Sequence, residues 1–86
     1  MTFRYLFTHR ALKDLDQFDQ STKSRLRTAL LRFQSDPLKY ADKLTDPQLG
    51  TYRFRVGMYR VIFDLVESDI VVLRIGHRRD IYRRRS

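Results

Sequence analysis

The stretch TYRFRVGMYRVIFDL, residues 51–65, decides the fold, because two alternating apolar segments flank a single Gly-Met pair. A two-residue turn at that pair would join the segments as a β-hairpin. In that register Arg55 lies opposite Arg60. Side chains alternate between the two faces of a strand, so both arginines share one face with Arg53. The other face then carries the apolar residues Tyr52, Phe54, Val56, Tyr59, Val61 and Phe63.

The facing pair Arg55 and Arg60 is unfavourable for folding alone. Like charges directly opposite each other on neighbouring strands destabilise a sheet by a few tenths of a kcal/mol or more. A bound anion would relieve the repulsion, and the planar guanidinium suits phosphate oxygens. The hairpin therefore predicts a phosphate site. The alternative is a solvated sheet face on which the arginines only keep the protein soluble.

The residues before the hairpin predict one strand and two helices. Thr2 to Phe7 alternates between polar and apolar residues, as a half-buried strand does. Thr8 can cap a helix over HRALKDLDQF, and Asp19 or Ser21 can cap a second helix that runs to Ser35. Pro37 ends it, and residues 36–50 are predicted to form a loop.

A third strand, IVVLRIG, follows the hairpin after a possible turn at Ser68 and Asp69. The sequence thus predicts a single α+β domain over residues 1–86 with the order β-α-α-β-β-β. A small antiparallel sheet would carry the helical hairpin on one face, and a short turn or helix would lie near residues 80–84.

The register of the last strand is ambiguous. With the Ser68-Asp69 turn, His77 lies opposite Arg60 on the arginine side, and Arg74 falls beside Phe63 among apolar residues. Either Arg74 reaches the sheet edge, or a turn longer by one residue flips the whole strand.

The composition favours an anionic partner. Eighteen lysine and arginine residues against ten aspartate and glutamate residues give a net charge of +8, and all nine basic residues after position 50 are arginine. Cysteine is absent, which excludes a disulfide framework and a thiolate metal site. No apolar run resembles a signal peptide or a membrane span, so we expect a cytoplasmic protein with no membrane partner.

Four further candidate residues, His77, Arg78, Arg79 and Tyr82, follow the last strand. A group that titrates near neutrality beside several arginines suits acid/base work on phosphate esters. A lone histidine is more often a surface or packing residue, and Tyr82 could equally be a core aromatic or stack on a base.

The segments YRFRVGMYRVIF and IGHRRDIYR, together with THRALKDLDQFD, resemble the RelE/ParE superfamily of type II toxin–antitoxin toxins, in its RelE-like branch. The resemblance covers nearly the whole chain. It implies a toxin that acts as a ribosome-dependent endoribonuclease and cuts mRNA in the A site through attack by the RNA 2′-hydroxyl. It also implies no metal or organic cofactor. The implied partners are an acidic cognate antitoxin, the ribosome and mRNA, with operator DNA contacted only through the antitoxin complex.

Carried over residue by residue, the resemblance gives Arg53 and Arg55 the role of gripping RNA and the scissile phosphate. Arg60 and Arg78 would stabilise transition-state charge, and Tyr82 would stack on or orient the substrate. Relatives commonly use lysine or glutamate as the base, whereas arginine hardly ever releases a proton.

We therefore expect His77 to shuttle the proton. Arg79, next to Arg78, is a further candidate for phosphate binding. Two alternatives are a ParE-like inhibitor of DNA gyrase and an inactive basic module that binds a partner or acts as a corepressor.

Overall fold

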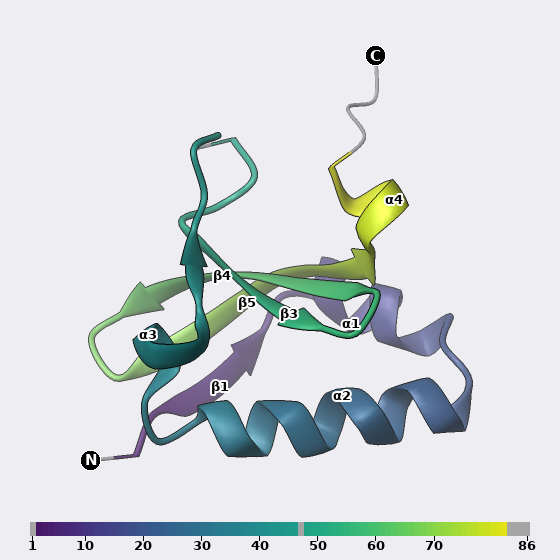
Figure 1. The fold of residues 1–86 in the computed structure, drawn as a ribbon, viewed down its shortest axis with the longest axis horizontal. Helices are drawn as coiled ribbons and strands as arrows, with labels where there is room; N and C mark the ends of the chain where they lie inside the picture. The colour runs from purple at the N-terminus through teal and green to yellow at the C-terminus, as the bar shows by residue number, and fades with distance from the viewer. Residues whose placement is uncertain (1, 47, 83–86) are drawn as a thin grey trace.

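The fold is seen in a computed structural model that describes residues 2–46 and 48–82. It is α+β, as predicted, and three helices and a two-residue strand separate the first strand from the hairpin (Figure 1). The elements are β1 (Arg4–Phe7), α1 (His9–Asp16), α2 (Gln20–Phe33), α3 (Pro37–Tyr40), β2 (Asp42–Lys43), β3 (Tyr52–Val56), β4 (Tyr59–Val66), β5 (Asp69–His77) and α4 (Arg78–Ile81).

Both long helices begin at the caps that the sequence predicts. The hydroxyl of Thr8 accepts a hydrogen bond from the Ala11 N–H at 3.1 Å, and the carboxylate of Asp19 accepts one from the Thr22 N–H at 2.8 Å. This bond lowers the pKa of Asp19. Pro37 stands at the first position of α3, so the segment predicted as a loop contains a helical turn and the short strand β2.

The sheet has the strand order β1-β5-β4-β3-β2. The prediction of a wholly antiparallel sheet was wrong for one pair, because β1 runs parallel to β5, with Arg4 beside Asp69 and Phe7 beside Val72. A parallel neighbour requires a long connection, and here the chain from β1 to β5 runs through α1, α2, α3 and the strands β2 to β4. The remaining pairs are antiparallel.

The β3–β4 hairpin has the predicted register. Val56 pairs with Tyr59 and Arg55 pairs with Arg60 around the Gly57-Met58 turn. Gly57 has φ of 59°, a conformation that glycine adopts at little cost. A side chain there would also lie 2.8 Å from the Arg25 guanidinium.

The β4–β5 register differs from both predicted versions. The turn falls one residue earlier, at Glu67 and Ser68, and Glu67 has φ of 56°. A β-bulge then inserts Leu73 between the residues that pair with Phe63 and Ile62.

The bulge decides which β5 side chains face the helices. It lets Val72 and Ile75 both enter the core although three positions separate them. Arg74 pairs with Ile62 and forms a salt bridge with Asp14 at 2.9 Å, so the predicted placement beside Phe63 was wrong.

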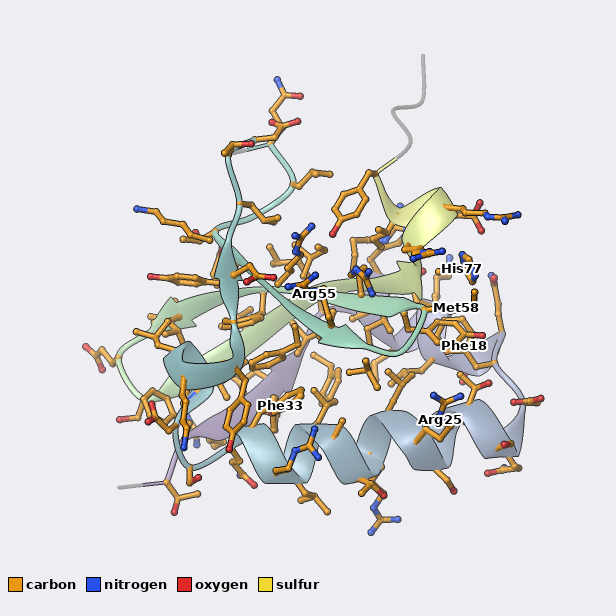
Figure 2. All side chains as sticks on the ribbon, in the orientation of Figure 1. Phe18, Arg25, Phe33, Arg55, Met58 and His77 are labelled. Carbon is orange, nitrogen blue, oxygen red and sulfur yellow. The ribbon has the colours of Figure 1, made fainter. Side chains whose placement is uncertain are left out.

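The core lies between α2 and one side of the sheet, which we call the helix face and define by Phe54, Val61 and Phe63 (Figures 1 and 2). Phe54 is fully buried, with its ring 4.5 Å from that of Phe33 and 4.3 Å from that of Phe63. The opposite side, defined by Arg53, Arg55 and Arg60, is the arginine face. No helix among the described residues is long and apolar enough to cross a bilayer.

Candidate functional site

Two arginines of β3 share one carboxylate on the arginine face. Asp42 of β2 pairs with Arg53 in the backbone register, and its Oδ2 lies 3.3 Å from Arg53 Nε and 3.1 Å from Arg55 Nε. The single negative charge does not neutralise the two guanidinium groups. Arg55 is largely exposed and keeps donors available for another anion.

Tyr82 completes this cluster from the far end of the chain. Its hydroxyl oxygen accepts a hydrogen bond from Arg53 Nη1 at 2.7 Å, and the guanidinium carbon lies 5.7 Å from the centre of the ring. The bond to Tyr82 and the contact with Asp42 together raise the pKa of Arg53, so the group remains a cation.

A cavity of about 290 Å³ opens beside this Arg53–Tyr82 pair. The segment between β2 and β3 forms its other wall and projects to the side of the sheet where α4 lies (Figure 1). Its lining residues are Leu44, Thr45, Asp46, Leu49, Arg53 and Tyr82. A cation, a phenol and two leucines around one cavity can hold a planar base with its phosphate.

Arg60 lies beside Arg55 in the backbone register, but its guanidinium is turned toward backbone carbonyl groups of the hairpin turn. The residue is only 9% exposed, and its Nη1 donates to the carbonyl oxygens of Gly57 at 3.0 Å and Tyr59 at 2.9 Å. Arg55 turns instead to Asp42. Each arginine thus has its own acceptor, and the pair does not need the anion that we predicted between them.

His77 lies on the other side of the sheet from the one predicted. It pairs with Tyr59 rather than Arg60, and the two rings meet edge to face with centres 5.8 Å apart. The Tyr59 ring in turn contacts Phe18, which joins His77 to an aromatic group near the end of α1 (Figure 2). The bulge between the partners of Phe63 and Ile62 moved His77 off the arginine face.

His77 also caps α4. Its Nδ1 accepts a hydrogen bond from the Arg79 N–H at 3.1 Å, which leaves the proton of the neutral ring on Nε2. The backbone N–H of Arg78 donates to the Met58 carbonyl at 2.7 Å and ties α4 to the hairpin turn. Both arginine side chains are exposed.

The structure therefore brings Arg53, Arg55 and Tyr82 together and separates them from His77. Sequence reasoning missed Asp42 and the cavity wall around Leu44 and Leu49. The signal for Asp42 was weak, because a two-residue strand has no periodicity to detect. Within residues 2–46 and 48–82, no three histidine, aspartate or glutamate side chains gather as metal ligands would.

Comparison with known proteins identifies the family. The model of the ParE toxin of the type II toxin–antitoxin system parDE matches residues 5–82. The chain is a RelE/ParE family toxin. A curated relative, Toxin RelG of Mycobacterium tuberculosis, is 32% identical over 91 residues, which cover 98% of this toxin and all of that protein.

Solved structures agree with this assignment. The toxin resembles a chain of the toxin–antitoxin complex RelBE2 from Mycobacterium tuberculosis with a TM-score of 0.69 and 26% identity, over 90% of this chain and 99% of that one. It also resembles a chain of the archaeal RelE–RelB complex from Pyrococcus horikoshii with a TM-score of 0.72 and 25% identity, over 91% and 97%. A chain of the Methanococcus jannaschii RelB–RelE complex, 24% identical, shares the fold with a TM-score of 0.73 over 94% and 99%.

Proposed function

We propose that this toxin is an endoribonuclease that cuts mRNA in the ribosomal A site. The observation that carries the proposal is the Arg53–Tyr82 pair beside a cavity on the arginine face. The RNA 2′-hydroxyl loses its proton and attacks the adjacent phosphorus, and the 5′-oxygen of the next nucleotide leaves with a proton. The products are a 2′,3′-cyclic phosphate and a 5′-hydroxyl, and no metal is required.

The arginines divide the work of binding and charge stabilisation. Arg53 and Arg55 hold the scissile phosphate after it displaces Asp42, because a bound phosphate offers more acceptor oxygens than the shared carboxylate. The exposed Arg78 and Arg79 extend the positive surface along α4. Such fixed cations stabilise the charge that grows on the phosphorane.

Proton transfer falls to Tyr82 in this scheme. Arginine stays protonated, and His77 faces Tyr59 rather than the phosphate. The Tyr82 hydroxyl lies on the arginine face within hydrogen-bond distance of Arg53, so it can accept the proton of the 2′-hydroxyl while it gives its own proton to the leaving 5′-oxygen. Since tyrosine is a weak base at neutral pH, alignment of the mRNA by the ribosome supplies the rest of the rate.

The partner that restrains the toxin is an acidic cognate antitoxin. The three structural relatives are each described as toxin–antitoxin complexes. An acidic segment would neutralise the arginine face before RNA reaches it. Operator DNA is bound only through the antitoxin complex, and the toxin acts in the cytoplasm.

The test is to incubate purified toxin with translating ribosomes and to map the mRNA ends. Wild-type toxin should give cuts within A-site codons that leave 5′-hydroxyl ends. Arg53→Ala and Tyr82→Phe should each lower the single-turnover rate by about 10²-fold or more. Arg4→Ala is the matched control, because Arg4 is an exposed arginine paired with Asp69 at the far edge of the sheet. Intact mRNA with wild-type toxin contradicts the proposal.

A second candidate is inhibition of DNA gyrase, which the match to the ParE family model favours. A gyrase inhibitor would leave the mRNA whole and block supercoiling of a relaxed plasmid by gyrase. An inert partner-binding module would do neither, and its expression without antitoxin would not arrest growth.

A further inference from the structure

A second positively charged surface lies on α2, on the side of the sheet opposite the arginine face. Arg25 and Arg32 are seven residues apart, with Thr28 between them, so all three project from one flank of the helix. The two arginine positions are separated by about 10 Å along the helix axis. A groove of about 430 Å³ follows this flank, lined by Ser24, Arg25, Thr28, Ala29, Arg32 and Val56.

Among residues 2–46 and 48–82, the two arginines of the groove have no aspartate or glutamate partner, in contrast to four arginines elsewhere in the protein. Arg4, Arg53, Arg55 and Arg74 each contact an aspartate. Within the described residues, neither Arg25 nor Arg32 forms a salt bridge, and the groove lining contributes two cations and no carboxylate. This charge is therefore uncompensated by the fold.

Aromatic contacts hold Arg32 in place, and Arg25 lies near the hairpin turn. Arg32 lies against the rings of Phe33 and Tyr40, with its guanidinium carbon 5.2 Å and 6.0 Å from their centres. Arg25 extends toward the β3–β4 turn, where its guanidinium approaches Gly57 (Figure 2). Ordering the Arg32 side chain in advance lowers the entropy that binding would cost.

We propose that the α2 groove binds the phosphate backbone of RNA, as a contact separate from the Arg53–Tyr82 cavity. Arginines grip two phosphates, and the hydroxyls of Ser24 and Thr28 can donate to the phosphate oxygens between them. The small apolar floor, Ala29 and Val56, offers little of the aromatic anchoring typical of protein interfaces. Two contacts on opposite faces would let one toxin hold two RNA segments at once.

The experiment compares two double variants that remove equal charge. Arg25→Gln with Arg32→Gln empties the groove of cations and keeps long side chains. Arg10→Gln with Arg27→Gln is the matched control: both residues are exposed, and Arg27 lines the groove between α1 and α2 on the other flank. Binding to a short RNA hairpin and to a 2′-O-methylated single strand is measured across salt concentrations, with thermal melts to verify folding.

The groove variant should reduce the magnitude of the slope of log K against log salt by about 1.4 to 1.8, two phosphate contacts at 0.7 to 0.9 each. The control should leave the slope nearly unchanged. If the slope falls only for the RNA hairpin, the groove binds the backbone of duplex RNA. If it falls only for the single strand, the groove binds an extended RNA chain. Both support the proposal.

Equal slopes for the two double variants overturn it, since net charge would then explain all binding. A polyglutamate peptide that binds the wild type and the control but not the groove variant, with RNA slopes unaffected, also overturns it in favour of an acidic protein partner. Neither result touches mRNA cleavage at the Arg53–Tyr82 pair, which is scored by mapped ends on ribosomes.

Discussion

The two faces of the β3–β4 hairpin arise from one alternation of side chains along the two strands, but their environments differ. The helix face buries Phe54, Val61 and Phe63 completely. The arginine face keeps Arg55 largely exposed and leaves Arg53 partly accessible at a cavity. The fully buried aromatic residues therefore lie on one side of the strands, and the exposed arginines of the hairpin lie on the other. Arg60 and Ile62 are exceptions, because both belong to the arginine face by position and are nevertheless buried.

Removal of the Phe54 side chain disrupts the packing of the helix face and has the largest expected effect on stability. Phe54→Ala leaves a cavity among Phe33, Phe63 and the helix, and should lower the free energy of unfolding by about 3 to 5 kcal/mol. Urea denaturation measures it. Leu31→Ala is the control, since Leu31 is 60% exposed on α2, and its effect should stay within about 0.5 kcal/mol. Comparable losses for the two variants would mean that the faces do not differ in this way.

Arg60→Ala tests whether the buried arginine acts as a support for the turn. It removes the donor to the Gly57 and Tyr59 carbonyls, and should lower the free energy of unfolding by about 2 kcal/mol together with cleavage. Arg53→Ala should lower cleavage at nearly unchanged stability. If Arg60→Ala abolished cleavage and left the denaturation midpoint where it was, Arg60 would belong with the phosphate-binding residues.

Two substitutions of His77 distinguish a capping role from a role in proton transfer. His77→Ala removes the cap of α4 and should cost about 1 kcal/mol, and it should slow cleavage by loosening Arg78 and Tyr82. His77→Asn keeps a side-chain acceptor that can cap but cannot shuttle a proton, and should restore most of the single-turnover rate. An Asn variant as slow as the Ala variant would return His77 to the catalytic role that the sequence suggested.

Asp42→Asn has the smallest expected effect on stability. A partly exposed ion pair contributes about 0 to 1 kcal/mol, so the denaturation midpoint should hardly move. The freed Arg53 and Arg55 should bind a 2′-O-methylated RNA a few-fold more tightly at low salt. Asp69→Asn, which frees Arg4 instead, is the control. Weaker RNA binding by Asp42→Asn would show that the carboxylate positions the arginines rather than competing with phosphate.

Short sequence patterns correctly predicted the parts of the fold that depend on neighbouring residues, namely the hairpin turn and the helix caps. The Gly57-Met58 turn and strict alternation gave the hairpin register, and Thr8 and Asp19 gave the helix starts. The parallel pairing of β1 with β5 depends on packing between distant segments, which no short pattern records. The second turn was misplaced because Glu67, rather than a more typical turn residue, adopts the left-handed conformation.

The candidate site was predictable as a list of residues and not as a geometry. Alternation placed Arg53 and Arg55 on one face correctly. It could not show that the long Arg60 side chain folds back onto its own turn, nor that a bulge at Leu73 shifts the register of the strand from Arg74 to His77. Asp42 was not predicted as a site residue, because its two-residue strand shows no periodicity and its partners Arg53 and Arg55 lie eleven and thirteen residues further along the chain.

The pairing of the first strand with the last also fixes when the fold can form during synthesis. Arg4 and its partner Asp69 are 65 positions apart, so β1 waits for its neighbour until most of the chain has been made. Tyr82 is added later still. The Arg53–Tyr82 pair therefore cannot form until both the hairpin and the last strand have been made.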